Sequence, residues 1–257
     1  MQQLATDPFG LRPLWNVLVD LYSDFAGFCA KHSLRHYAAF GTALGAIRHH
    51  GFIPWDDDFD VYMPRPDYEV FCHLLYEYED QPFVLRNLHN DYNYGLVFSK
   101  IFCRDKRKVI EIQKQVKYEV KPDSVFIDVF PLDGLPQGNF EFKVWIIERA
   151  IRRRMIMLSP AKTLRHHMLL SLEQWGRKWD YDHSKYVQCY HENLCKIKDR
   201  KYTREMFGEA RWVPFENVQI AVPEEVDSYL RAEFGDYMQL PPEAERFPLH
   251  RNLEMSL

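Results

Sequence analysis

Residues 40–61, FGTALGAIRHHGFIPWDDDFDV, decide how the rest of the chain is interpreted. The stretch ends in a cluster of four aspartates within five positions, 56–60. Aspartate is disfavoured on strands, and neighbouring carboxylates repel one another. Large apolar side chains nevertheless flank this cluster and tether it to the core, which is unusual for a solvated acidic turn. The pattern therefore favours a functional group of carboxylates.

Asp58 and Asp60 are the first candidate residues of that group. They alternate with Phe59 and Val61, which predicts a β-strand, and side chains two residues apart on a strand share a face. Two adjacent carboxylates in a partly buried place need a cation. Hard oxygen ligands suit Mg²⁺ or Mn²⁺, which in turn bind substrate phosphates. We predict that Asp58 and Asp60 are metal ligands and catalytic residues.

A third carboxylate is expected from another strand. Asp128 stands alone in the otherwise apolar run Val125–Phe130. It is the preferred candidate, although a strand-end cap or a surface position would also account for it. Asp133 is the competing candidate, but it adjoins Gly134 and fits a turn better.

Gly41 and Thr42 lie between a strand predicted at 35–40 and a short helix predicted at 43–48. Backbone N–H groups at a helix N-terminus form an anion site, and glycine allows a phosphate to approach closely. The Thr42 hydroxyl could cap the helix or contact a phosphate. We predict substrate contacts at both residues.

Basic side chains are expected to neutralise the phosphates of a substrate. Lys100 lies on an apolar strand, where an unpaired buried ammonium is costly, so it either extends to the rim of the core or faces the phosphates. Arg104 follows close behind it. Arg48 either contacts the substrate or forms an ion pair with Asp56 or Asp57.

The glycine–threonine turn and the aspartate strand, sixteen residues apart, resemble the nucleotidyltransferase fold of the polymerase-beta type. The full stretch 40–61 is similar, more specifically, to the LicD family of phosphocholine transferases, relatives of fukutin and fukutin-related protein. Segments 127–133 and 234–242 resemble further motifs of that family. So does His250, which we predict to lie on the substrate side.

The resemblance implies transfer of a phosphorylated alcohol, such as phosphocholine, from a CDP-linked donor of the CDP-choline kind. The acceptor would be a hydroxyl of a cell-surface glycan or of its lipid-linked precursor. Asp58 and Asp60 would then be metal ligands and Asp128 the third carboxylate, with Asp56 as an alternative member of the metal shell. Asp128 is also the best candidate to accept the proton of the acceptor hydroxyl.

Other activities of the same fold stay open at this point. They are nucleotidyl transfer from an NTP, phosphodiester hydrolysis, and a non-catalytic binding role. The oligomeric state is also open.

The expected fold class is α+β, a nucleotidyltransferase-type mixed sheet flanked by helices, with a mainly helical C-terminal part. Residues 1–137 form the predicted catalytic core, and residues 138–257 form a mainly helical extension packed on it, so that the two parts are expected to make one integrated unit. Apolar periodicity and runs place the other elements: helices at 11–28, 68–78, 142–158 and 164–179, and strands at 95–102 and 124–130.

The composition is that of a globular protein, with 46% hydrophobic and 27% charged residues. The net charge of −4 gives no indication of nucleic-acid binding. No apolar run reaches the roughly 18 residues of a membrane span, so a cytoplasmic location is expected. A basic run within 149–165 is either a solvated helix face or a peripheral contact with an anionic membrane: Arg149, Arg152, Arg153, Arg154, Lys162 and Arg165.

Overall fold

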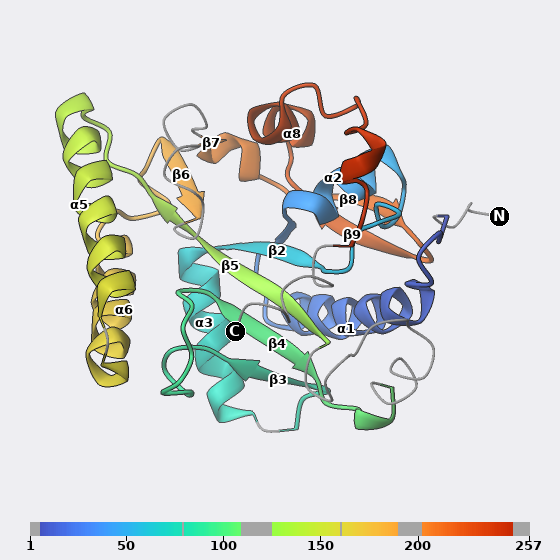
Figure 1. Ribbon diagram of the computed structural model, residues 1–257, viewed down its shortest axis with the longest axis horizontal. Helices are drawn as coiled ribbons and strands as arrows, with labels where there is room; N and C mark the ends of the chain where they lie inside the picture. Colours follow the sequence, from blue (N-terminus) through green and yellow to red (C-terminus); the bar gives the residue numbers. More distant parts are fainter. Residues whose placement is uncertain (1–5, 79, 109–124, 160, 190–201, 249–257) are drawn as a thin grey trace.

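The computed structural model describes residues 6–78, 80–108, 125–159, 161–189 and 202–248. A mixed sheet forms its centre (Figure 1), with the strand order β1-β2-β5-β4-β3, β6 beside β5 and β7 beside β6. Of the described pairs, β2 and β5 run parallel and the others antiparallel. The strands are β1 Tyr37–Ala38, β2 Asp60–Pro64, β3 Phe83–Arg86, β4 Ser99–Cys103, β5 Phe126–Gly134, β6 Tyr186–Cys189 and β7 Tyr202–Thr203.

Helices flank this sheet, and a separate hairpin packs near its β1 edge. The hairpin consists of β8 Arg211–Phe215 and β9 Val218–Val222. Two short 3₁₀ turns, η1 Arg204–Phe207 and η2 Glu243–Glu245, lie in the C-terminal part. The helices are α1 Arg12–Lys31, α2 Phe40–Arg48, α3 Arg65–Glu77, α5 Asn139–Leu158, α6 Lys162–Gly176 and α8 Val226–Phe234.

The two faces of the sheet are covered by different helices. On one face α1 and α3 pack side by side, with the rings of Phe25 and Phe71 5.4 Å apart. On the other face the ring of Tyr62 in β2 lies 5.1 Å from Phe40 of α2 and 6.1 Å from Tyr229 of α8. Because side chains alternate along a strand, Asp60 shares this second face with Tyr62.

The predicted fold class is confirmed, since a mixed sheet with flanking helices is what the structure shows. Strand β5 runs four residues further than expected, through Pro131 to Gly134. Proline normally interrupts a sheet because it lacks an N–H. Here Pro131 lies between the end of the β4 pairing at Val129 and the start of the β6 pairing at Leu132, so no ladder partner is required on that edge.

The part beyond residue 138 contains more strands than expected. Helices α5 and α6 lie close to their predicted ranges, but β6 to β9 were not predicted. Strand β6 pairs with β5, so the central sheet continues across the expected division between residues 137 and 138. These strands are short, and short strands give little alternation to detect.

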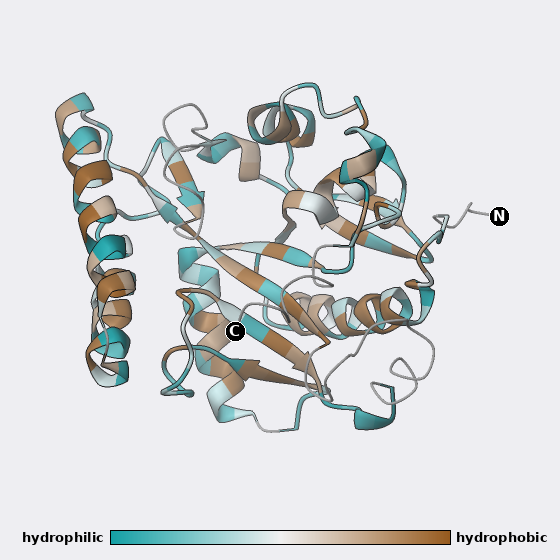
Figure 2. Ribbon diagram, in the orientation of Figure 1, coloured by the Kyte–Doolittle hydropathy of each residue, from teal (hydrophilic) through white to brown (hydrophobic). Residues whose placement is uncertain are grey.

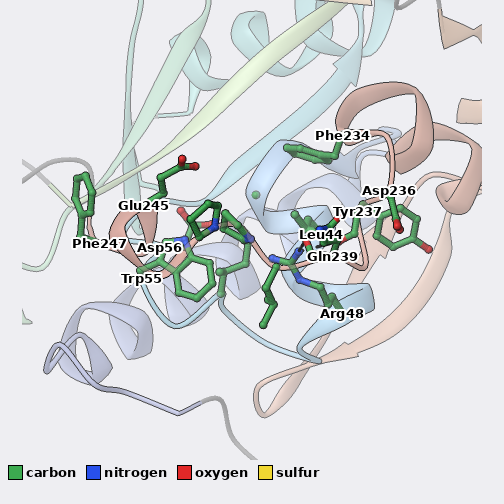
Figure 3. A pocket seen from close by; sticks show the side chains of 15 residues that line it. Leu44, Arg48, Trp55, Asp56, Phe234, Asp236, Tyr237, Gln239, Glu245 and Phe247 are labelled. Atoms are coloured by element: carbon green, nitrogen blue, oxygen red, sulfur yellow. Dashed lines mark hydrogen bonds between the residues drawn. The ribbon is translucent and has the colours of Figure 1, made fainter.

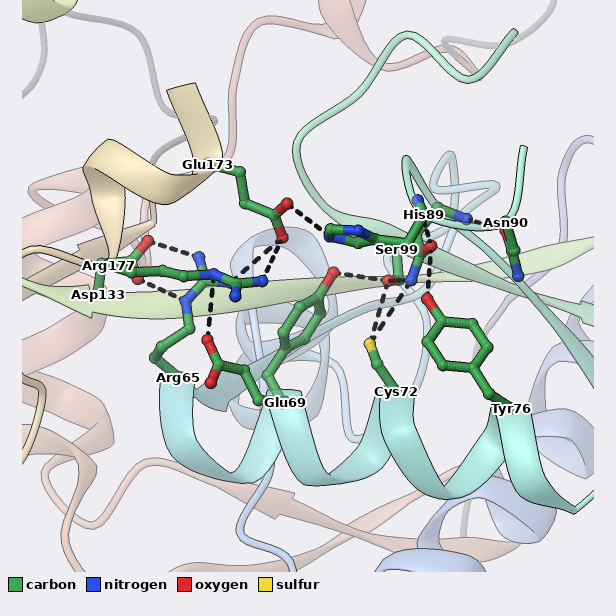
Figure 4. Close-up of polar contacts among 12 residues, drawn as sticks. Arg65, Glu69, Cys72, Tyr76, His89, Asn90, Ser99, Asp133, Glu173 and Arg177 are labelled. Atoms are coloured by element: carbon green, nitrogen blue, oxygen red, sulfur yellow. Dashed lines mark hydrogen bonds and ion pairs between the residues drawn. The ribbon is translucent and has the colours of Figure 1, made fainter. Parts of the chain in front are cut away.

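A buried polar network joins α6 to the sheet (Figure 4). Arg65, at the start of α3, binds Asp133 of β5 with two hydrogen bonds of 2.6 and 2.8 Å. Its guanidinium also lies 3.7 Å from Glu173 of α6, which is hydrogen-bonded to His89 at 2.8 Å and to Arg177 at 3.0 Å. The network therefore holds α6 against α3 and the central sheet through paired charges.

Another buried group, His36, is expected to make the stability of the fold depend on pH. Burial lowers the pKa of His36 to about 4 from its usual 6.5, and its Nε2 lies 3.1 Å from the Tyr22 hydroxyl. The folded state therefore favours the neutral ring, so its contribution is complete above pH 6.5 and is lost as pH falls toward 4. This group should remove about 2 kcal/mol of stability between roughly pH 7.5 and 5.

The measurement is urea denaturation of the wild type and of His36→Gln at several pH values. The glutamine side chain cannot titrate, so the difference in unfolding free energy between the two proteins should shrink as the pH falls. A difference that stays constant over that range would contradict the assignment.

Candidate active site

Three charged side chains form a row across the centre of the sheet. Asp60 of β2 pairs in register with Asp128 of β5, and Asp128 pairs with Lys100 of β4. Neighbouring strands lie about 4.8 Å apart, and residues in register point to the same face. The Lys100 ammonium contacts Asp128 Oδ1 at 2.5 Å and lies 3.4 Å from the centre of the Phe126 ring. The tertiary fold thus brings Asp60, Asp128 and Lys100 together.

Asp56 and Asp58 extend this row beyond the start of β2. The strand begins at Asp60 rather than at Asp58, so Asp58 lies in the loop that enters it. The side chains of Asp56 and Asp58 are hydrogen-bonded to each other. The loop and the sheet therefore gather four carboxylates, those of Asp56, Asp58, Asp60 and Asp128.

The crowding of these carboxylates raises pKa values. Burial is the main cause for Asp60, followed by the negative charges of Asp58, Asp128 and Asp56, and the pKa rises well above its usual range although Lys100 opposes the change. Burial and the charge of Asp58 likewise raise the pKa of Asp56. Such a group is stable only with bound protons or with a compensating cation.

The start of α2 fixes the backbone of Asp60. The Asp60 N–H donates to Thr42 Oγ1 at 2.9 Å, and the Asp60 carbonyl accepts from the Ala39 N–H at 2.9 Å. Between these contacts Phe40 has a φ of 43°, an uncommon value for a residue with a Cβ. The helix thus begins at Phe40, three residues earlier than predicted, and Gly41 and Thr42 form its first turn. The Thr42 hydroxyl positions the strand.

Gly41 leaves room for the side chain of Asp56. A Cβ on Gly41 would lie 2.4 Å from Asp56 Oδ2, so an alanine requires that carboxylate to move. The backbone of Asp56 is also held, because its carbonyl accepts a hydrogen bond of 2.8 Å from the Trp15 indole of α1. The glycine is therefore needed for close approach of a carboxylate of this chain.

The chemistry of the four carboxylates suits a divalent cation. Carboxylate oxygens are preferred ligands of Mg²⁺ and Mn²⁺, and a pair of acids that share a hydrogen bond must release a proton to bind one. Within the described ranges, no three His, Cys, Asp or Glu side chains converge as a metal-binding group in their present orientations. Metal binding by Asp58, Asp60 and Asp128 stays a prediction.

A cavity of about 550 Å³ adjoins the acidic cluster at Asp56 (Figure 3). Gly41 and Asp56 form part of its wall, and the segment 234–247 forms much of the rest. Arg48 lines the cavity and donates a hydrogen bond of 2.7 Å to the Tyr237 carbonyl. Its Nε also lies 3.0 Å from His49 Nε2, so the hydrogen bonds of Arg48 lead to the C-terminal segment and to its own helix end rather than to the acidic cluster.

The other predicted residues are not all near this centre. Arg104 is exposed and lines a different cavity. That cavity lies beside Tyr76 of α3 and Tyr78, the residue that follows this helix. Asp133 is buried in its ion pair with Arg65, so it is not available as the third carboxylate. His250 lies outside the described residues.

Sequence reasoning gave no role to several residues that build this site. Trp15 holds the acidic loop, and the cavity wall includes Trp55, Phe234 and Phe247. Phe234 and Phe247 are 40% and 42% exposed, high values for large apolar side chains. Phe234 and Phe247 lie on either side of the proline pair 241–242 in the sequence, and this pattern was the available signal for the cavity wall.

The fold and the site define a class of protein: an α+β protein whose carboxylates cluster where two parallel strands begin, beside an open cavity. Residues 33–169 match the family model described as LicD/FKTN/FKRP, nucleotidyltransferase domain. The chain belongs to this family. The matched region contains the acidic cluster, Asp128 and Lys100.

Individual relatives agree with the family match. The chain is 26% identical over 264 residues to the lipopolysaccharide cholinephosphotransferase LicD of Haemophilus influenzae, which covers 93% of this chain and 96% of that protein. It is also 28% identical to uncharacterised proteins of Rickettsia typhi and Rickettsia prowazekii, over 131 and 130 residues. Those two matches cover 48% of this chain and 40% and 48% of the respective relatives.

Proposed function

We propose that this protein transfers phosphocholine from a CDP-linked donor to a hydroxyl of a glycan. The relative that spans nearly the whole chain is a lipopolysaccharide cholinephosphotransferase, which supports a transferase of this kind. The observation that carries the proposal is the row of carboxylates with Lys100, which meets an open cavity at Asp56. Phosphoryl transfer depends mainly on positioning and charge stabilisation, and such a row offers both.

A divalent cation, Mg²⁺ or Mn²⁺, is part of the proposal. Asp58 and Asp60 would hold it, with Asp56 or Asp128 as the third ligand, because these carboxylates already lie together. When bound, such an ion neutralises the donor diphosphate and polarises its oxygens. The acids of this site would then lose the protons that their crowding now favours.

Asp128 and Lys100 have separate parts in the proposed reaction. Asp128 would accept the proton of the attacking hydroxyl, for which it must come within hydrogen-bond reach of that oxygen. Lys100, which contacts Asp128 at 2.5 Å, would hold that carboxylate in place and place positive charge near the transferring group. Thr42 would act on the strand backbone, through the N–H of Asp60.

The cavity beside Asp56 is the proposed donor site. Its volume of about 550 Å³ falls in the range of small-ligand pockets. Trp55 offers a ring face, and Asp236 and Glu245 add negative charge to the same cavity. Aromatic faces and carboxylates together bind quaternary ammonium groups. The guanidinium of Arg246 already lies 5.7 Å from the centre of the Trp55 ring, so this ring accepts a cation.

A donor panel tests the proposal. The protein is incubated with Mg²⁺ or Mn²⁺ and with CDP-choline, CDP-glycerol, CDP-ribitol or an NTP, together with a glycan acceptor, and the products are analysed by mass spectrometry. The expected result is CMP release and acceptor labelling with CDP-choline, abolished by EDTA. Pyrophosphate release from an NTP would instead identify a nucleotidyltransferase, and CMP release without acceptor labelling would identify a hydrolase.

Gly41→Ala is expected to lower the activity without a comparable loss of stability. The new Cβ displaces the Asp56 carboxylate, so we expect CMP release to fall about tenfold, a barrier increase of about 1.4 kcal/mol. Alanine is also the better helix former, so the free energy of unfolding should not decrease by more than about 1 kcal/mol. Gly27→Ala in α1 is the matched control, because a Cβ there has no neighbour within 4 Å. Equal loss of activity in both variants would contradict this role of Gly41.

A further inference from the structure

Helix α5 exposes an apolar stripe along its whole length. Its six members recur at intervals of three and four residues, which places them on one side of the helix. All are between 37% and 79% exposed. We call them the α5 outer stripe: Phe140, Val144, Ile147, Ile151, Met155 and Leu158.

The opposite side of α5 already packs on the protein. Phe142, Trp145 and Arg149 are buried there, and the ring of Trp145 stacks 5.6 Å from that of Trp175 in α6. The outer stripe is therefore not needed for this packing. An ordinary surface helix is apolar on one side only, whereas α5 is apolar on two. In Figure 2 helix α5 lies at the rim of the molecule, away from the central sheet.

Positive charge accompanies the stripe. Residues 139–165 contain seven Lys or Arg and two Glu, in a chain whose net charge is −4. Lys143 lies one helical turn before Ile147, and Arg154 lies one turn after Ile151, so both lie along one edge of the stripe. Both side chains are exposed. Glu141 and Glu148 lie along the other edge, where Glu148 accepts a hydrogen bond from the Trp175 indole of α6.

Fewer basic residues lie on the outer face of α5 than the sequence predicted. Arg149 is fully buried, and the guanidinium of Arg152 lies over the Trp175 ring at 5.5 Å. These two arginines therefore belong to the packing between α5 and α6. Lys143 and Arg154 are the basic residues that adjoin exposed apolar side chains.

We propose that the α5 outer stripe docks on an anionic lipid bilayer, with α5 parallel to the membrane surface. A helix of 20 residues is about 30 Å long, and an apolar face of that length with a basic edge is typical of helices that lie in the bilayer interface. None of the helices in the described part of the chain combines the length and apolar content needed to span a bilayer.

The positive charge of segment 139–165 favours an anionic bilayer over a second copy of this chain as the partner of the stripe. Two copies that pack through this stripe would bring two segments of the same positive charge together, which is unfavourable. An anionic leaflet attracts those same residues. The stripe also lies on a convex helix surface, which inserts between headgroups without needing a complementary groove. This proposal stands independently of the reaction catalysed.

Vesicle co-sedimentation of the full chain is the test. We expect binding to vesicles of phosphatidylcholine mixed with phosphatidylglycerol, weak binding to phosphatidylcholine alone, and loss of binding as salt is raised. Ile151→Glu should lower the partition coefficient about tenfold or more, because it removes an apolar side chain and adds a negative charge. Arg154→Glu should weaken binding to the anionic vesicles and leave the weak binding to neutral vesicles unchanged.

Val70→Glu is the matched control, since Val70 is 46% exposed on α3 and lies outside the stripe. It should bind vesicles like the wild type, and circular dichroism should show all variants folded. Wild-type binding by Ile151→Glu, or no binding to anionic vesicles at low salt, would overturn the proposal. So would a dimer in analytical ultracentrifugation that Ile151→Glu dissociates, because it would assign the stripe to a second copy.

Discussion

Asp58→Asn is expected to reduce CMP release from CDP-choline by about 10³-fold or more, the effect of losing about 4 kcal/mol of transition-state stabilisation. Asparagine keeps the shape of the side chain and removes its charge. Asp58 is hydrogen-bonded to Asp56 and raises the pKa of Asp60, so it belongs to the centre of the cluster. Asp60→Asn should have an effect of similar size.

The fold should persist in both variants. Four neighbouring carboxylates repel one another, so removal of one charge relieves repulsion, and the melting temperature should stay the same or rise. Mn²⁺ binding, followed by calorimetry without substrate, should weaken at least about tenfold, equivalent to about 1.4 kcal/mol. Asp182→Asn, at a side chain that is 47% exposed, is the control for a neutral substitution. Normal CMP release and normal Mn²⁺ binding by Asp58→Asn would contradict the proposed centre.

Arg65→Ala is expected to cost about 3–5 kcal/mol of unfolding free energy, the usual result of breaking a buried ion pair. Arg65 is 7% exposed and holds Asp133 by two hydrogen bonds. Its loss would leave Asp133 and Glu173 as buried carboxylates near one another. The network joins α6 to the sheet, so α6 should be the first element to lose amide-exchange protection.

Two further variants make this prediction specific. Arg65→Met with Asp133→Leu removes both charges of the pair, so it should recover part of the lost stability. Arg231→Ala breaks an exposed pair with Asp227 and should leave the denaturation midpoint unchanged. If Arg65→Ala shifted the midpoint no more than Arg231→Ala, the network would have no structural importance.

Residues close together in the chain were the ones whose arrangement could be predicted. Helix α1 follows from the spacing of its leucines and phenylalanines, which repeats over five turns. Strand β2 also follows from its local pattern, although it begins at Asp60, two residues later than the alternation around Asp58 predicted. In each case the pattern lies within one element, where local geometry alone sets the direction of the side chains.

Predictions that depended on neighbours far along the chain were less accurate. The Thr42 hydroxyl accepts a hydrogen bond from the Asp60 N–H, a contact that the sequence did not predict, and its phosphate contact stays a prediction. Arg104 was expected close to the site, but it follows the end of β4 and lines another cavity. Arg149 was expected on a basic face, but it is buried beside Trp145. The partners of these side chains come from other elements, and no local pattern indicates them.

By itself, the sequence determined the fold class, the family and the identity of the clustered carboxylates, because a helix period, a strand period and a crowded acidic motif are properties of adjacent residues. Tertiary structure alone decided that Asp128 lies opposite both Asp60 and Lys100, that Asp133 pairs with Arg65, and that the C-terminal segment forms one wall of the cavity. Strand register and helix packing set these distances, and both depend on the burial of the whole core at once.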